Sequence, residues 1–159
     1  MANYKKAARL FIPLAGGLVI GRLTAKAQED YKDYKTPPFS PPPAAFPVVW
    51  PALYTVMGVA YNMAYESKKD DKLTKSHYTQ LALNYAWSIL YFNLKLRGTA
   101  LIESYCLLAA AIVAAVQFYE ADKKAGLMMI PYVMWLSYAT YLNGGNWLLN
   151  RDDEDYSNE

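Results

Sequence analysis

The sequence has almost none of the residues that build metal centres or disulfides. Of its 159 residues, one is cysteine, Cys106, and one is histidine, His77. A single cysteine cannot form a disulfide within the chain, and neither residue stands in a CxxC or HxxxH pattern, the spacing typical of zinc sites. The composition therefore predicts no metal site and no internal disulfide.

An excess of charge of one sign is also missing. The formal net charge is +2, and lysine and arginine are scattered between apolar runs instead of being gathered on one face. Because nucleic-acid binding needs a basic surface, nucleic acid is not an expected partner. No internal repeat is visible, which argues against a repeat array and against a transporter built from inverted repeats.

Long stretches without charge are what the sequence has in quantity. The run 126–149 carries no charged residue. The mean hydropathy of −0.04 hides such stretches because tyrosine, present 15 times, scores as polar. About 20 mostly apolar residues suffice for a helix to cross the roughly 30 Å hydrocarbon core of a bilayer. The run therefore predicts a membrane-spanning helix.

Four further stretches have the same character and are separated by charged or proline-rich segments. They predict an all-α integral membrane bundle of five transmembrane helices, a single domain of residues 1–159 that ends in an acidic tail at 150–159. Residues 26–45 are charged and then proline-rich, and proline lacks the amide that a helix interior needs, so a long loop is expected between the first two helices. The expected spans are residues 7–25, 46–65, 77–95, 99–119 and 126–149.

The first of these spans has a second interpretation. Lys5, Lys6 and Arg9 precede a short apolar stretch, and residues 25–27 (AKA) are similar to the small-residue cleavage site of a secretory signal. If the stretch crosses the membrane instead, Arg9 and Arg22 have to reach opposite headgroup layers. The sequence leaves both alternatives open.

Three expected helices carry a stripe of aromatic side chains at helical spacing. Such spacing places residues three, four or seven positions apart on one helical face. The stripes consist of Trp50, Leu53, Tyr54, Met57 and Tyr61; of Asn84, Trp87, Ser88 and Tyr91; and of Trp135, Tyr138, Ala139 and Leu142.

The expected depth of each tryptophan in the membrane distinguishes two explanations for its position. Trp50 and Trp147 stand near the ends of their expected spans, where indole rings commonly lie at the bilayer interface. Trp87 and Trp135 fall near span centres, where an indole N–H has lost water and needs a partner. Ordinary helix packing is the alternative for both, and Asn84 is equally consistent with a hydrogen bond that joins two helices. Together, Asn84, Trp87 and Trp135 predict an aromatic pocket for a flat hydrophobic ligand.

Glu103 is the one charged residue inside the fourth expected span. Near the start of that helix it can reach the interface, or it can face inward and accept a hydrogen bond. It is also the only carboxylate within a span that a small transporter could use for coupling.

Three segments, in their order along the chain, resemble the TspO/MBR family of tryptophan-rich sensory proteins. The family's first loop and the start of its helix 2, its helix 3 and its helix 5 are similar to residues 37–54 (PPFSPPPAAFPVVWPALY), 83–88 (LNYAWS) and 130–143 (IPYVMWLSYATYLN). The resemblance covers nearly the whole chain, which is identified as a bacterial member.

The resemblance implies a five-helix membrane receptor or sensor that binds porphyrins such as protoporphyrin IX, and other flat hydrophobic molecules, in a pocket closed by the first loop. The porphyrin is then the ligand, and no cofactor is required. The positions that match or adjoin the family's pocket are Tyr31, Trp50, Tyr54, Asn84, Trp87, Tyr91, Trp135, Ala139 and Leu142.

The resemblance also implies an alternative activity. Trp50 and Trp135 match the tryptophans linked, in bacterial members, to light- and oxygen-dependent porphyrin breakdown. An indole stacked on an excited porphyrin is a reasonable electron donor, so these two residues are the candidate catalytic residues of a porphyrin-degrading enzyme. A small-molecule transporter is the third alternative.

Four positions depart from the family pattern. Phe39 stands where many members have tryptophan, and Asp30 stands where a tryptophan often precedes the loop tyrosine, so a less tightly closed lid is expected. Near the end of the last span, Gly144 and Leu148 replace the aromatic and basic residues of a sterol-binding motif. Porphyrin is therefore a better supported ligand than cholesterol.

The chain is expected to cross the bacterial cell membrane several times. Its expected partners are the lipid bilayer and a second copy of the chain, with which it forms a homodimer. Lysines and arginines number nine at the N-terminus and in the second and fourth loops, against seven on the other side. Because basic residues concentrate on the cytoplasmic side, this small excess favours a cytoplasmic N-terminus.

Overall fold

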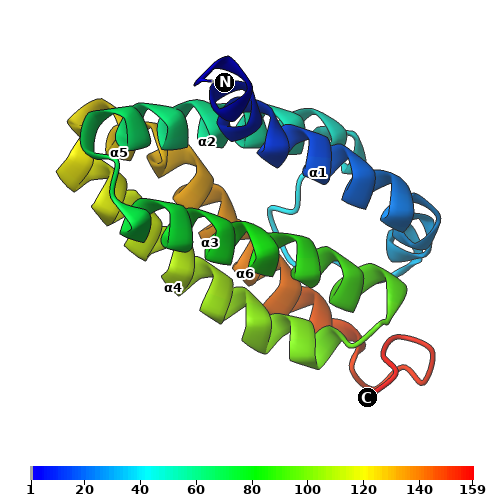
Figure 1. Cartoon of the computed structure of the whole chain (residues 1–159). Coiled ribbons are helices and arrows are strands. Elements are labelled where there is room, and N and C mark those ends of the chain that lie inside the picture. The colour runs from blue at the N-terminus through cyan, green and yellow to red at the C-terminus, as the bar shows by residue number, and fades with distance from the viewer. Residues whose placement is uncertain (1) are drawn as a thin grey trace.

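A computed structural model of the chain describes residues 2–159. In this part of the chain all regular elements are helical and there is no strand, so the expected all-α class is confirmed. Five long helical segments run alternately in opposite directions along the bundle, and consecutive segments are antiparallel (Figure 1).

The helices begin and end at residues with recognisable local reasons. Asp70 and Asp122 cap two helix starts, since their carboxylates accept from the backbone N–H groups of Lys72 at 2.9 Å and Lys124 at 2.8 Å. Met129 interrupts the last segment two residues before Pro131. The helices are α1 (Ala2–Asp30), α2 (Phe46–Lys68), α3 (Asp71–Ser88), α4 (Arg97–Ala121), α5 (Lys123–Met128) and α6 (Ile130–Asn150), with 3-10 turns η1 (Tyr31–Asp33) and η2 (Pro43–Ala45) and a π-helical turn η3 (Ile89–Asn93).

Three helical segments of the described chain are long and apolar enough to cross a membrane. They are Asn3–Asp33, Pro43–Lys68 and Arg97–Ala121. Helices α3 and α6 are not among them, because α3 carries charged residues in its first turns and α6 is rich in tyrosine and asparagine. Five crossings therefore stay a prediction.

Helix α3 extends beyond the apolar stretch at its start. It begins at Asp71, six residues before the expected span, because its first turns are charged and capped by Asp70. Trp87 lies one residue before the end of α3, and the π-helical turn η3 continues the helical segment to Asn93. Trp135, by contrast, lies near the centre of the segment formed by α5 and α6.

Side chains fill the bundle unevenly along its length. One half, formed by the last turns of α2 and α4, the first turns of α3, and α5 with the start of α6, contains a continuous buried core. We call it the packed half; its buried residues include Met57, Ala60, Tyr61, Ala64, Leu73, Ala111, Ala114, Phe118, Ala125, Met129 and Tyr132.

The first turns of α1 complete the packed half by close approach to α2. A Cβ atom added at Gly58 would overlap the carbonyl oxygen of Leu10, so only glycine allows the two backbones to come this near. Beside it, Arg9 donates from Nε to Asn62 Oδ1 at 3.0 Å and forms an ion pair with Glu66. The opposite half of the bundle, which we call the hollow half, encloses a cavity.

Candidate functional site

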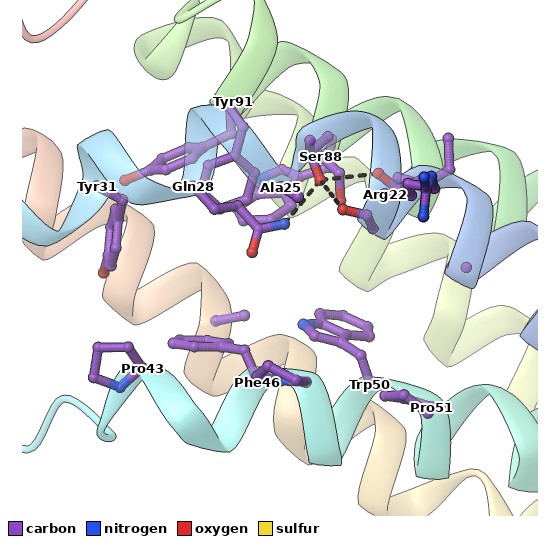
Figure 2. A pocket seen from close by; sticks show the side chains of 18 of the residues that line it. Arg22, Ala25, Gln28, Tyr31, Pro43, Phe46, Trp50, Pro51, Ser88 and Tyr91 are labelled. Carbon is purple, nitrogen blue, oxygen red and sulfur yellow. Dashed lines mark hydrogen bonds between the residues drawn. The ribbon is translucent and has the colours of Figure 1, made fainter.

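A cavity of about 950 Å³ lies in the hollow half, mainly between α1 and α2. Figure 2 shows Arg22 and Gln28 of α1 on one side of it and Phe46 and Trp50 of α2 on the other. Its inner wall comes from α3, η3 and α6. Small-molecule pockets typically enclose roughly 300–1,000 Å³, so this cavity is large enough for an extended ligand.

Two glycines of α1 show where the space opens. A Cβ atom at Gly17 would overlap the ring of Tyr54, so α1 and α2 are still in contact at this level. One turn later, a Cβ atom at Gly21 would meet nothing within 4 Å. Helix α1 therefore leaves α2 between these two residues, and the later turns of α1 become a wall of the cavity.

Tryptophan and tyrosine rings form most of the opposite walls. The rings of Trp50 and Trp135 are perpendicular, with centroids 6.3 Å apart, and Trp50 stacks on Tyr54 at 5.5 Å. Trp87 stacks on Tyr91 at 5.0 Å. These separations are those of favourable aromatic pairs, so the rings hold one another in place. The cavity thus has flat, rigid apolar surfaces.

The π-helical turn η3 explains why so many rings of one segment meet the cavity. Its wider turn brings Tyr91 and Phe92 to the lining together with Trp87 and Ser88 of the preceding α3 turn. The indole of Trp87 donates to Asn143 Oδ1 at 2.9 Å, so its polar atom is already satisfied by α6. The ring face remains available to a ligand.

Trp135 differs from Trp87 in its polar atom. Its Nε1 is buried and finds no hydrogen-bond acceptor among residues 2–159, although the side chain lines the cavity. A buried indole N–H without a partner is costly. Because this nitrogen is not exposed to the cavity, a ligand there meets the ring of Trp135 and not its N–H.

Asn84 does not line the main cavity and connects helices instead. Its Oδ1 accepts from the Tyr54 hydroxyl at 2.5 Å, and its Nδ2 donates to the Tyr132 hydroxyl at 2.9 Å. Tyr132 in turn donates to Gln80 Oε1 at 2.6 Å. Because this network uses both polar atoms of its amide, Asn84 links α2, α3 and α6, which was the alternative interpretation. Its role in ligand binding stays a prediction.

The other predicted ligand-binding residues do meet around the cavity, and their binding role stays a prediction. Sequence reasoning missed almost the whole contribution of α1, although Gly17, Gly21 and Ala25 repeat every four residues. Such spacing is typical of close helix contact, which Gly17 makes and Gly21 does not. The predicted residues in the lining are Tyr31, Trp50, Tyr54, Trp87, Tyr91, Trp135, Ala139 and Leu142; the missed ones include Arg22, Thr24, Gln28, Lys32, Ser88, Phe92 and Asn143.

The segment between η1 and η2 runs from the cavity mouth across α6. Tyr138 and Tyr141 donate from their hydroxyls to the carbonyl oxygens of Phe39 and Pro38, the second at 2.8 Å. The side chain of Phe39 is 91% exposed and covers nothing. Residues 42–44, by contrast, line the cavity and form part of its edge.

Behind Tyr91, a buried arginine lies among aromatic rings. The guanidinium carbon of Arg97 is 4.5, 4.7 and 5.1 Å from the ring centroids of Tyr156, Tyr34 and Tyr91. Arg97 is 0% exposed, and its two terminal nitrogens have no hydrogen-bond partner within the described chain. Cation–π contacts of this kind contribute about 2 kcal/mol or more when desolvated.

The C-terminal tail supplies one wall of this arginine site. The buried Tyr156 donates from its hydroxyl to Asn146 Oδ1 at 2.6 Å, and the hydroxyl of Tyr91 donates to the same oxygen. Burial raises the pKa of Tyr156 to about 12, so the phenol stays neutral and keeps this bond. The tail is therefore tied through Asn146 to a residue of the cavity wall.

Sequence comparison places the chain among known proteins. The TspO/MBR family pattern matches residues 9–148. The tryptophan-rich protein TspO of Archaeoglobus fulgidus is 34% identical over 149 residues, 92% of this chain and 97% of the relative. The translocator protein homolog of Schizosaccharomyces pombe is 35% identical over 147 residues, 87% and 88% of the two chains.

A third relative is named as a sensory protein. The tryptophan-rich sensory protein of Cereibacter sphaeroides is 30% identical over 135 residues, which cover 84% of each chain. The three relatives come from different organisms, so the expected bacterial origin stays a prediction. The fold, the tryptophan-lined cavity and these matches lead to one conclusion: the chain belongs to the TspO/MBR family of membrane proteins.

Proposed function

We propose that the protein is a membrane receptor that binds porphyrins, protoporphyrin IX among them, and other flat hydrophobic molecules in the cavity of the hollow half. The observation that carries the proposal is the cavity itself, about 950 Å³ in volume and lined by Trp50, Trp87 and Trp135. Flat indole faces suit a planar ligand because stacking adds to the gain from burying apolar surface. Relatives named translocator protein and tryptophan-rich sensory protein fit a receptor or sensor.

Titration with protoporphyrin IX tests this function. Saturable quenching of tryptophan fluorescence and a shifted Soret band are expected. Replacing both Trp50 and Trp135 by phenylalanine should weaken binding about tenfold or more, because two indole stacking faces are replaced by smaller rings. Trp147→Phe is the matched control, since Trp147 lies outside the cavity lining. A titration without saturation, or one in which the double variant binds like the control, contradicts the proposal.

Porphyrin degradation is the second candidate function. Trp50 and Trp135 meet at right angles on the cavity wall, so either indole can face a bound ring. With light and oxygen, breakdown should be faster than with an unrelated porphyrin-binding protein, and either substitution should remove the excess. Equal rates with the unrelated protein would indicate a side reaction of a bound photosensitiser.

We do not propose transport. The carboxylate oxygens of Glu103 are buried without a hydrogen-bond partner in the described part of the chain, but the residue is not part of the cavity lining. A coupling group is expected to meet the transported molecule or its path. Glu103→Gln should accordingly leave porphyrin binding unchanged.

For the membrane arrangement, we propose five crossings, a cytoplasmic N-terminus and a homodimer. Exposed apolar side chains of α4, Ile102 and Val116 among them, are suited to contact lipid or a second copy. Tags at the two termini, tested for protease access in intact cells, should show the N-terminus protected. An accessible N-terminal tag would reverse the orientation.

A further inference from the structure

We propose that the C-terminal tail, residues 151–159, is a releasable latch over the first loop, residues 34–42 between η1 and η2. In the closed state the tail holds the loop against the end of the hollow half, and its release gives a ligand a path from water into the cavity. The inference goes beyond the proposed function because it concerns how a ligand enters and leaves. It rests on that function only for the porphyrin used in one of its tests.

Hydrogen bonds attach the tail to the connection between η3 and α4. The carbonyl oxygen of Lys95 accepts from the backbone N–H of Asn158 at 2.9 Å and from the hydroxyl of Ser157 at 2.9 Å. One turn further along the chain, the backbone N–H of Thr99 donates to Glu159 Oε1 at 2.8 Å. Figure 1 shows the tail, in red, at the end of the bundle where α4 begins. Asn158 and Glu159 are exposed, so water can replace their bonds at little cost.

The ring of Tyr156 is the one buried side chain of the tail. It packs nearly perpendicular to the ring of Tyr34 in the first loop, with centroids 5.1 Å apart, and the Tyr34 hydroxyl donates to the carbonyl oxygen of Asp155 at 3.0 Å. The acidic residues 152–155 are exposed and take no part in the two ion pairs found among residues 2–159. The attachment of the tail to the loop therefore depends mainly on one aromatic side chain.

The part of the first loop that the tail contacts leads directly into the cavity wall. Tyr31 lines the cavity, and Tyr34 follows at the end of the same 3-10 turn. The backbone of Lys35 is bound to α6, because its N–H donates to Asn150 Oδ1 at 3.0 Å and its carbonyl oxygen accepts from Asn146 Nδ2 at 2.8 Å. Lys35 is therefore a fixed point, and the tail holds the chain on the cavity side of it. Release of the tail frees Tyr34 and, through it, the turn that carries Tyr31.

Arg97 makes the closed state costly. It is 0% exposed, and its guanidinium carbon lies 4.5 Å from the ring centroid of Tyr156 and 4.7 Å from that of Tyr34. Its terminal nitrogens have no hydrogen-bond partner within the described chain, and burial of such a cation costs solvation free energy that cation–π contacts offset only in part. When Tyr156 moves away, water reaches these nitrogens and the cost is removed. The open and closed states therefore lie closer in free energy than the contacts alone indicate, as a reversible latch requires.

Thiol labelling without any ligand tests the latch. Ser88 lines the cavity and Cys106 is the only cysteine, so Ser88→Cys in a Cys106→Ser background places a single thiol there. In bilayer discs, a charged maleimide reaches this thiol from water only. Tyr156→Ala should raise the labelling rate about tenfold, because it removes the ring that closes the latch. Tyr105→Ala, the same change at an exposed tyrosine of α4, is the matched control, and equal rates in the two variants would overturn the inference.

Arg97→Met tests the role of the charge. Methionine is apolar and needs no solvation, so the closed state should be favoured and labelling should slow about threefold. Labelling at the original rate, or faster, would overturn the role given to the charge.

Hydrogen exchange tests the release of the tail without any substitution. The backbone N–H groups of Thr99 and Asn158 are bonded across the contact between the tail and α4, so they should exchange at one common rate if the tail opens as a unit. Two unrelated rates would show separate fraying of the two ends and would contradict a latch. This measurement decides the matter even if a substituted protein fails to fold.

Stopped-flow mixing with protoporphyrin IX connects the latch to the proposed function. Tyr156→Ala should raise the association and dissociation rate constants together and change Kd by less than about twofold, because a gate alters the two rates and not the bound state. If porphyrin does not bind but labelling responds to Tyr156→Ala, the proposed function is wrong and the latch stands. If porphyrin binds and neither labelling nor the binding rates respond, the latch is wrong and the proposed function stands.

Discussion

The packed half and the hollow half use the same kinds of side chain for opposite purposes. In the packed half, aromatic rings press on one another and on alanines: His77 stacks on Tyr61 at 4.0 Å, and Phe118 is fully buried beside them. In the hollow half, Trp50 and Trp135 contact each other and neighbouring rings, but both also border the cavity. Aromatic content alone therefore does not indicate a binding site.

The difference shows how a small membrane protein can carry a large cavity. Lipid is as apolar as leucine, so helices in a bilayer associate through close packing and hydrogen bonds and not through the hydrophobic effect. The packed half supplies both, with Gly58 against Leu10 and with the Asn84 network at its border. Stability should consequently reside in one half and ligand binding in the other.

Truncating one aromatic ring in each half should give the largest difference in unfolding free energy. Phe118→Ala leaves a hole among close-packed neighbours and should cost about 3–5 kcal/mol of unfolding free energy. Phe46→Ala, the matched change, enlarges a cavity that is already open and should cost far less. Unfolding in mixed detergent micelles measures both, and equal losses would remove the distinction between the halves.

Substitution of two glycines by alanine should give the next largest difference in stability. Gly58→Ala should destabilise the protein by about 1–3 kcal/mol, because the new methyl group meets backbone that cannot move aside. Gly21→Ala should be neutral or stabilising by up to about 1 kcal/mol, since its Cβ meets nothing within 4 Å and alanine favours helix.

Gly21 also provides a test of the cavity. Gly21→Leu fills part of the space and should weaken porphyrin binding without loss of stability. If Gly21→Leu unfolds the protein, or if Gly58→Ala leaves it unchanged, the two halves are not as different as their packing indicates.

The smallest change in stability is expected from a substitution in the C-terminal tail. Tyr156→Phe removes one hydrogen bond to Asn146 and keeps the ring over Arg97, so it should cost about 1 kcal/mol and alter porphyrin binding little. Tyr156→Ala also removes the ring over Arg97 and should cost more unfolding free energy than Tyr156→Phe. Unfolding in mixed detergent micelles and carboxypeptidase release of the tail measure this, and identical behaviour of both variants would show that the ring is unimportant.

Helical spacing explains which parts of the site could be predicted. Trp50 and Tyr54, or Trp135 and Ala139, stand four residues apart, and any helix places such residues on one face. The side of α1 could not be found in this way. Glycine and alanine at four-residue spacing predict contact with a neighbour, and whether the neighbour is present depends on where α1 and α2 separate.

Asn84 shows the same limit for a polar residue. An amide deep in a membrane helix must find partners, which the sequence already required. Whether the partners are a ligand or other side chains depends on the two tyrosines that reach it from α2 and α6.

By itself, the sequence determined the helical class, the membrane character, the family and the order of the tryptophan stripes, because each depends on composition and spacing along one chain. Tertiary structure alone decided where the bundle is solid and where it is hollow. It also decided that Asn84 joins helices, that α1 forms a cavity wall, and that Arg97 lies behind Tyr91. Those features depend on distances between helices, and helical periodicity specifies a face but not what lies opposite it.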